Sequence, residues 1–123
     1  MVILVDSREQ RALKFPIEGA VTAVETVTLS VGDYSCRYAT GTISPVVFER
    51  KGLSDLFSTM TRGYPRFKRA LVRARQAETS LILIVEGTLS DVYAGVPQSS
   101  WSGELVVQKL FTLLVRYGLQ PVF

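Results

Sequence analysis

The sequence predicts an α/β fold with a mixed central β-sheet flanked by helices. Short apolar runs of strand length, such as residues 2–5 and 81–85, alternate with longer segments whose apolar residues recur at helical spacing. Two further strand-like runs flank Ala39-Thr40-Gly41, which is typical of a turn, and so predict an antiparallel hairpin. Strands that alternate with helices, combined with one hairpin, give a sheet of mixed direction.

The predicted elements fill the chain without linkers or internal repeats. We expect strands at residues 2–5, 21–29, 33–38, 43–48, 80–86 and 120–123. Longer helices are expected at residues 53–60, from 65 to about 78 and at 103–117, with a short helix or turn at 10–14 and a helical turn at 89–93. Pro65 suits the first position of a helix, and Gly118 is typical of a helix end. Residues 1–123 therefore form a single domain.

Composition excludes several classes of protein. An apolar content of 47% supports a packed core, and no apolar run approaches the ~20 residues needed to span a bilayer. The first residues lack the basic region of a signal peptide, and the single cysteine, Cys36, excludes an intrachain disulfide, so we expect an intracellular protein without membrane contact. The chain has no histidine, which excludes histidine-based catalytic triads and histidine metal ligands.

Positive charge is concentrated in one part of the chain. Eight of the fourteen basic residues lie between Arg50 and Arg75, where the only acid is Asp55. This excess predicts a polyanionic partner, because a merely solvated helix face would also contain glutamates. Tyr64 is a candidate for stacking on bases, whereas we expect Trp101 to cover the sheet edge rather than to act as a DNA wedge. Four arginines at spacings of three or four are expected to contact phosphate groups: Arg62, Arg66, Arg69 and Arg73.

Acidic and basic residues also meet at the open ends of the predicted hairpin. Asp33 begins one strand and Glu49 follows the other, so the two carboxylates are expected to be neighbours that hold a hard cation such as Mg²⁺. Lys51 lies two residues after Glu49 and projects to the same side of the sheet, where it can act on the attacking water or on the phosphate. Arg50 projects to the other side and is expected to pair with Asp55 or to contact phosphate.

This arrangement is what metal-dependent phosphodiester hydrolysis needs. Taken alone, an Asp followed by Glu-x-Lys is common, and a hairpin with ordinary surface charges is the alternative.

Three segments together resemble the nuclease domain of the XPF/Hef-type structure-specific endonucleases. They are Val5-Asp6-Ser7-Arg8-Glu9, Val31-Gly32-Asp33-Tyr34 and Phe48-Glu49-Arg50-Lys51-x-x-x-Asp55, in the order of that family, and residues 62–71 are similar to its next helix. The resemblance covers nearly the whole chain. It implies a restriction-endonuclease-like core and Mg²⁺- or Mn²⁺-dependent cutting of branched DNA, such as 3′ flaps and forks.

The resemblance also implies roles for individual residues. Asp33 and Glu49 are then metal ligands, Asp6 is a further acid at the metal, and Lys51 is the catalytic lysine. Arg50 falls in the catalytic motif as well, while supporting or DNA-contacting roles fall to Arg8, Glu9 and Asp55. For several of these residues a structural role is the alternative: a cap for Asp6, an ion pair for Arg8 and Glu9, and a favourable position at a helix N-terminus for Asp55.

The family implies partners that the chain alone does not identify. Members usually continue into a tandem helix-hairpin-helix module, and none follows Phe123, so the chain is expected to be either a compact version or an excerpt. A homodimer, or a heterodimer with a DNA-binding partner, is expected, associated with DNA in the cytoplasm or nucleoid, or in the nucleus of a eukaryote. Two alternative functions are a DNA-binding module that recruits a partner without cutting, and a Holliday-junction resolvase on the same core.

Overall fold

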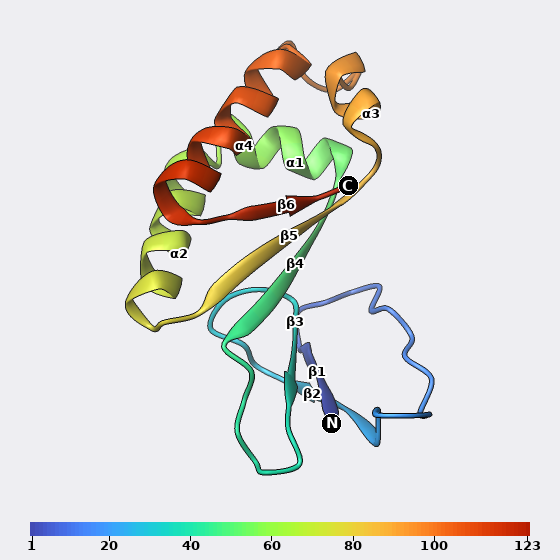
Figure 1. Ribbon diagram of the computed structural model, residues 1–123. Coiled ribbons are helices and arrows are strands. Elements are labelled where there is room, and N and C mark those ends of the chain that lie inside the picture. Colours follow the sequence, from blue (N-terminus) through green and yellow to red (C-terminus); the bar gives the residue numbers. More distant parts are fainter.

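The computed structural model of the protein describes residues 1–123 and contains one six-stranded sheet in the order β2-β1-β3-β4-β5-β6 (Figure 1). Strand β1 is parallel to β2 and antiparallel to β3, β3 is antiparallel to β4, and β4, β5 and β6 are parallel. This confirms the predicted mixed sheet. The strands are β1 (Val2–Asp6), β2 (Ala23–Val27), β3 (Tyr34–Arg37), β4 (Val46–Gly52), β5 (Ser80–Glu86) and β6 (Gln120–Val122).

Four helices complete the fold: α1 (Leu53–Met60), α2 (Tyr64–Gln76), α3 (Leu89–Ala94) and α4 (Gly103–Tyr117). Their ends follow the expected local chemistry. Pro65 lies in the first turn of α2, the Ser102 hydroxyl accepts a hydrogen bond from the Leu105 N–H at the start of α4, and Gly118 ends α4 in the left-handed conformation. No helix is long and apolar enough to cross a membrane.

The predicted boundaries differ from the structure mainly around β4. The hairpin partner was expected to end at residue 48, but β4 continues through Glu49, Arg50 and Lys51 to Gly52, because each of these residues pairs with β5. The charged triplet therefore lies within a strand rather than after it. The strand expected at 21–29 is shortened to β2, and residues 10–14 contain a turn but no helix.

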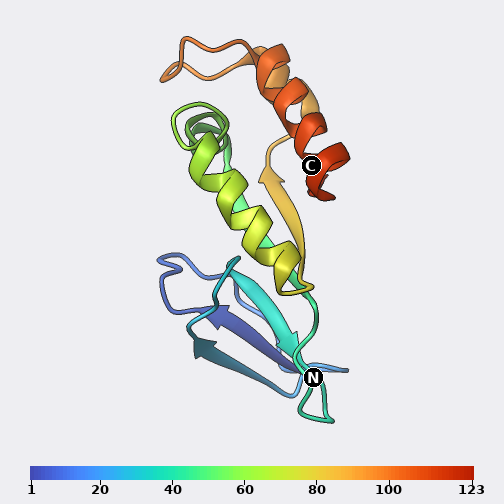
Figure 2. The ribbon, with the colours of Figure 1, turned by 90° about the vertical axis from the view of Figure 1, so that its left-hand side faces the viewer.

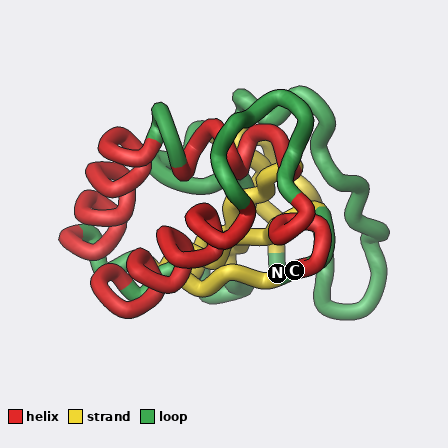
Figure 3. The backbone as a smooth tube through the Cα atoms, turned by 90° about the horizontal axis from the view of Figure 1, so that it is seen from above, coloured by secondary structure: helices red, strands yellow, loops and turns green.

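One face of the sheet carries the main core. On β5, Leu81, Leu83 and Val85 are buried against α1, α2 and α4, whereas Ile82 and Ile84 on the opposite face are half-buried. Leu110 and Leu113 of α4 belong to this core. Figures 1 and 3 show the longer helices on one side of the molecule and the long loop that follows β1 on the other.

Gly32 fixes how the chain enters β3. Its φ is +78°, a conformation that is strained for any residue with a side chain, and an added Cβ would lie 3.1 Å from Val47 Cβ and 3.2 Å from the Phe48 carbonyl oxygen. Glycine at residue 32 therefore lets the backbone beside Asp33 approach β4 closely without strain or displacement of Val47 and Phe48.

We predict that Gly32→Ala destabilises the protein more than Gly41→Ala does. Gly41 also has a positive φ, of +89°, but an added Cβ there meets nothing within 4 Å. Gly41→Ala should lower the free energy of unfolding by about 1–2 kcal/mol, the cost of placing a side chain on a left-handed backbone. Gly32→Ala should lower it further, because the new Cβ also presses on β4. Urea unfolding of both variants measures the difference, and equal losses would show that the close approach at Gly32 is unimportant.

Candidate active site

The three sequence motifs meet at one place because the chain at Asp33 is hydrogen-bonded on both sides. The Asp33 N–H donates to the Phe48 carbonyl at 2.7 Å, and the Asp33 carbonyl accepts from the Asp6 N–H at 2.8 Å. Asp33 thus joins the end of β1 to the middle of β4. Side chains alternate along a strand, so Glu49 and Lys51 project to the same face of β4, which is the face that carries the core residue Val47.

Asp33 and Glu49 form a pair of carboxylates that keep free oxygen atoms. Asp33 Oδ2 accepts from the Arg50 N–H at 2.8 Å, and Glu49 Oε1 lies 3.5 Å from Lys51 Nζ. Asp33 Oδ1 and Glu49 Oε2 have no hydrogen-bonding partner in the protein. Both side chains lie in the same cavity, which leaves these two oxygens for a ligand.

The electrostatics of this pair favour a bound cation. Burial raises the pKa of Asp33, although the hydrogen bond from Arg50 N–H opposes the shift. Burial also raises the pKa of Glu49; the Lys51 ammonium partly offsets this, and the charge of Asp33 raises the pKa further. Ionising both groups at neutral pH therefore costs free energy that a divalent cation would recover.

The available ligands fit Mg²⁺, which is usually held by one or two carboxylates and completes its octahedron with water and phosphate oxygens. No three side chains of the acidic or cysteine type come together as a metal site. Asp33 and Glu49 are therefore the two carboxylates whose free oxygens could hold such a cation.

Asp6, the predicted third ligand, lines the same cavity as this pair but has its carboxylate oxygens occupied. Its buried carboxylate accepts hydrogen bonds from Arg8 Nε at 2.8 Å, from the Leu29 N–H at 2.8 Å, and from Arg8 Nη2 and the Arg8 N–H at 3.2 Å each. The Arg8 guanidinium is the main reason why the pKa of Asp6 is lowered. With both oxygens occupied, Asp6 holds Arg8 and the segment after β2 in place, which is closer to the capping role considered as the alternative.

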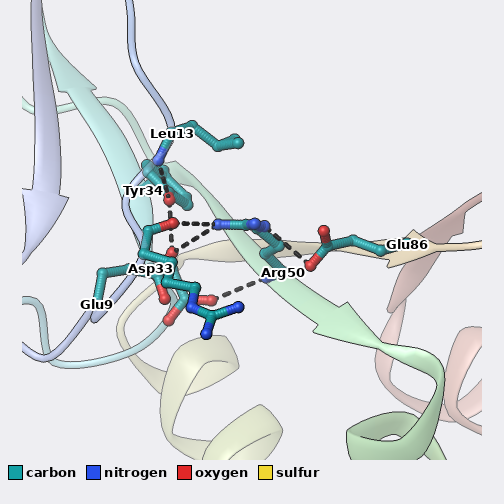
Figure 4. Close-up of polar contacts among 7 residues, drawn as sticks. Glu9, Leu13, Asp33, Tyr34, Arg50 and Glu86 are labelled. Carbon is teal, nitrogen blue, oxygen red and sulfur yellow. Dashed lines mark hydrogen bonds and ion pairs between the residues drawn. The ribbon is translucent and has the colours of Figure 1, made fainter.

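The Arg50 side chain lies on the face of β4 opposite Glu49 and Lys51 and does not line their cavity. Figure 4 shows it between Glu86 and the group formed by Tyr34 and Glu9. Its guanidinium donates to Glu86 Oε1 at 2.9 Å and to the Arg11 carbonyl at 2.7 Å, and it lies 3.4 Å from Glu9 Oε2. The predicted pairing of Arg50 with Asp55 is therefore wrong, and so is an ion pair between Arg8 and Glu9. Asp55 is exposed in the first turn of α1 and forms no ion pair.

Glu9 belongs to the same network as Arg50. The Tyr34 hydroxyl donates to Glu9 Oε2 at 2.5 Å and accepts from the Leu13 N–H at 3.0 Å. The network ties the loop after β1 to β3, β4 and β5. Glu9 and Arg50 therefore support the sheet beneath the carboxylate pair instead of lining its cavity.

The cavity that contains the carboxylate pair has a volume of about 570 Å³ and one strongly basic wall. Asp6, Arg8, Asp33, Glu49 and Lys51 lie on one side of it. The facing side belongs to α1, α2 and the turn between them, and includes Ser58, Thr59, Arg62, Arg66 and Arg73.

The structure divides the residues predicted to contact DNA. Arg62, Arg66 and Arg73 line the cavity, but Arg69 does not. Tyr64 is turned toward α4, where Lys109 Nζ lies 4.6 Å from its ring centroid and 4.7 Å from that of Trp101. Trp101 therefore packs on a lysine of α4 instead of covering the sheet edge.

Sequence reasoning missed the role of Lys109. Its ammonium also donates to the Met60 carbonyl at the end of α1, at 2.8 Å. Lys109 lies within the helix predicted at 103–117, and a lysine inside a helical pattern carries no sequence signal that it will cap a distant helix.

A family model described as "ERCC4 domain" matches residues 5–123 of this chain. The chain belongs to the ERCC4 domain family. Among curated protein sequences, none is similar enough to this chain to count as a match.

Solved structures share the fold of this ERCC4 domain. The structure of XPF from Aeropyrum pernix superposes with a TM-score of 0.67 at 20% identity, over 99% of this chain and 55% of the XPF chain. A second structure, XPF from Aeropyrum pernix in complex with DNA, gives a TM-score of 0.65 at 23% identity, over 98% of this chain and 55% of that chain. The present ERCC4 domain thus spans about half the length of these XPF chains, and its sheet and helices are arranged as in the XPF nuclease fold, which is restriction-endonuclease-like.

We predict that Glu49→Gln stabilises the metal-free ERCC4 domain at neutral pH. The pKa of Glu49 is higher in the folded chain than in the unfolded chain. At a pH between these two pKa values the folded chain therefore binds more protons than the unfolded chain. Its free energy of unfolding falls as the pH rises through this range. Glutamine removes this loss. The measurement is the melting temperature of Glu49→Gln minus that of wild type, in EDTA. This difference should be small below pH 4.5, the ordinary pKa of a glutamate, and should increase toward neutral pH.

Glu25→Gln is the matched control, because Glu25 is an exposed carboxylate paired with Arg37 on the far side of the sheet. It should show no such gain. The description of the site's electrostatics would be wrong if Glu49→Gln were less stable than wild type at pH 7 and if this deficit were larger at pH 7 than at pH 4.

Proposed function

We propose that this ERCC4 domain is a metal-dependent DNA endonuclease that hydrolyses phosphodiester bonds in flapped, forked or otherwise branched DNA. One observation supports this proposal above the others. A single cavity contains two carboxylates with free oxygens, a lysine beside them, and a facing wall of three arginines. Metal-dependent phosphodiester hydrolysis needs carboxylates that bind a cation and basic groups that bind the phosphate. Here the carboxylates and the arginines lie on opposite sides of one cavity.

Asp33 and Glu49 are the proposed ligands of Mg²⁺ or Mn²⁺. The bound cation would polarise the scissile phosphate and offset the negative charge that develops on it. Asp33 is held for this task by its backbone bonds to β1 and β4 and by the Arg50 N–H, so its free oxygen needs little reorganisation.

Lys51 and the arginines act on the DNA. Glu49 keeps the Lys51 ammonium at the cavity, where it can orient the attacking water and stabilise charge on the phosphate. Water attacks the phosphorus, the bond from phosphorus to the 3′ oxygen breaks, and that oxygen takes up a proton. The products are a 5′-phosphate and a 3′-hydroxyl. Arg62, Arg66 and Arg73 hold neighbouring phosphates, and Arg8, anchored by Asp6, presents its remaining guanidinium edge to the same cavity.

The proposal predicts that Asp33→Ala and Glu49→Ala each lower cleavage at least 100-fold, equivalent to about 2.7 kcal/mol of barrier, while DNA binding changes little. Labelled flap, fork and Holliday-junction DNAs, each incubated with Mg²⁺ or Mn²⁺, provide the measurement. Glu25→Ala, which removes a carboxylate far from the cavity, should cleave like wild type.

Each other outcome of this panel has a defined meaning. Cutting by either alanine variant in Mg²⁺ contradicts the assigned ligands. Binding to every substrate without products favours a module that recruits a partner to DNA. Paired symmetric cuts confined to the Holliday junction favour a resolvase.

A further inference from the structure

Ion pairing is divided unevenly over this molecule. All five ion pairs involve basic residues from β1, β3, β4 or the residues next to them: Arg8, Arg37, Arg50 and Lys51. From Arg62 onward the chain has eight further basic residues, and none of them is paired with a carboxylate. They are Arg62, Arg66, Lys68, Arg69, Arg73, Arg75, Lys109 and Arg116.

Helix α2 carries most of this unpaired charge. Its thirteen residues include five basic side chains and no acid, and no acidic residue lies in its first turn. Like charges at i and i+4 destabilise a helix, and basic residues near its N-terminus oppose the helix dipole. Arg73 and Arg75 lie in the last turn, where the dipole favours cations, but Arg66 lies in the first turn and Arg69 and Arg73 are like charges at i and i+4. A polyanionic ligand outside the chain would offset the repulsion among these unpaired cations.

The basic residues of α2 lie on two flanks of the helix. At about 100° per residue, Arg66 and Lys68 are separated by about 160° around the axis, and the same holds for Arg73 and Arg75. Arg66 and Arg73 face the cavity of the carboxylate pair, which we call the cavity flank. The buried residues Phe67, Leu71 and Ala74 lie between the two flanks on the inner side, and Arg69 lies between them on the outer side.

The second side, which we call the outer flank, is formed by Lys68 and Arg75 of α2 together with Arg116 of α4. A shallow cavity of about 530 Å³ adjoins this flank at Lys68 and extends over the outer side of α2 to Arg73, which also borders the first cavity; its other lining residues are Pro65, Arg69, Val72 and Tyr117. Arg75 Nη1 donates to the Arg116 carbonyl at 3.1 Å, which holds the end of α4 against α2. Figure 2 shows α2 toward the viewer and α4 to one side of it, and the Arg75–Arg116 hydrogen bond is the link between the two helices on the outer flank.

Two cations of this region already have partners within the chain. Lys109 lies between the rings of Tyr64 and Trp101 and donates to Met60, and Arg75 is bound to the Arg116 carbonyl. The remaining cations of the outer flank are the half-buried Lys68, whose ammonium lies 5.0 Å from the centroid of the Tyr64 ring, and the exposed Arg116. Neither cation forms a hydrogen bond or an ion pair within the chain. These two side chains are free to contact a ligand.

We propose that the outer flank binds a second segment of nucleic-acid backbone, so that α2 lies between two segments of one branched DNA. One segment enters the cavity flank, where its phosphate meets the carboxylate pair, and the other crosses Lys68 and Arg116. A helix with its side chains is about 10–12 Å across, a separation that two strands diverging from a branch point can straddle. A linear strand occupies the cavity flank alone. The outer flank therefore selects branched DNA. This inference rests on the proposed nuclease function.

A pair of matched double variants tests the proposal. Lys68→Gln with Arg116→Gln removes the two free cations of the outer flank, and Arg11→Gln with Lys14→Gln removes the same charge from exposed residues of the loop after β1. Each variant is assayed with a forked DNA and with a linear DNA that carries the same sequence around the cut site.

We expect the outer-flank variant to lower kcat/KM on the fork at least tenfold and to change it less than about twofold on linear DNA. The slope of log binding constant against log salt for the fork should fall in magnitude by about 1.5, as expected when two phosphate contacts are lost. The variant in Arg11 and Lys14 should behave like wild type. A third variant, Arg62→Gln with Arg66→Gln, should weaken both substrates.

The outcome that overturns the inference is an equal loss on fork and linear DNA in the outer-flank variant, or an equal loss in the variant of Arg11 and Lys14. Fluorescence anisotropy separates this inference from the nuclease function. If wild type cuts neither DNA, the nuclease proposal fails, yet a preference for fork over linear DNA that disappears only in the outer-flank variant still supports two binding flanks.

Discussion

The hydrogen bonds of one short backbone segment hold the site together. Asp33 is bonded through its N–H to Phe48 and through its carbonyl to Asp6, so three distant parts of the sequence meet around a single residue. Gly32 permits this approach because a Cβ in its place would press on Val47 and on the Phe48 carbonyl. The backbone places the Asp33 carboxylate in the same cavity as Glu49, close enough for its charge to raise the pKa of Glu49. Everything proposed about cation binding depends on that proximity.

The alternation of side chains along β4 then separates two kinds of chemistry. Glu49 and Lys51 face the helices and the basic wall, whereas Arg50 between them faces the other side and joins Glu9 and Glu86. The site therefore has carboxylates whose ionisation is costly on one face and a satisfied ion-pair network on the other. Functional sites commonly combine destabilising groups with well-satisfied interactions nearby, because proteins give up some stability for function. We infer the same for α2, where the proposed DNA ligand would neutralise unpaired cations that repel one another.

Much of this could be predicted from the sequence, for physical reasons that differ between elements. The boundaries of α1, β5 and α4 follow from apolar periodicity and from Gly118, which are local signals. The shared side of Glu49 and Lys51 follows from strand geometry alone. The length of β4 could not be predicted, because it depends on pairing with β5, thirty or more residues later in the chain. The role of Asp6 was also hidden, since it depends on the Leu29 N–H and on how Arg8 folds back. Partners of Arg50 and Lys109 depend on tertiary packing in the same way.

The central claim is that Asp33 and Glu49 hold one divalent cation between them. Calorimetric titration of Mn²⁺ into wild type, Asp33→Asn, Glu49→Gln and the double variant tests it most directly. Two ligands of one shared site are not independent, so each single substitution should abolish nearly all the binding that the double substitution abolishes. Single variants that each retain a substantial part of the wild-type affinity, with losses that add up in the double variant, would contradict a shared site.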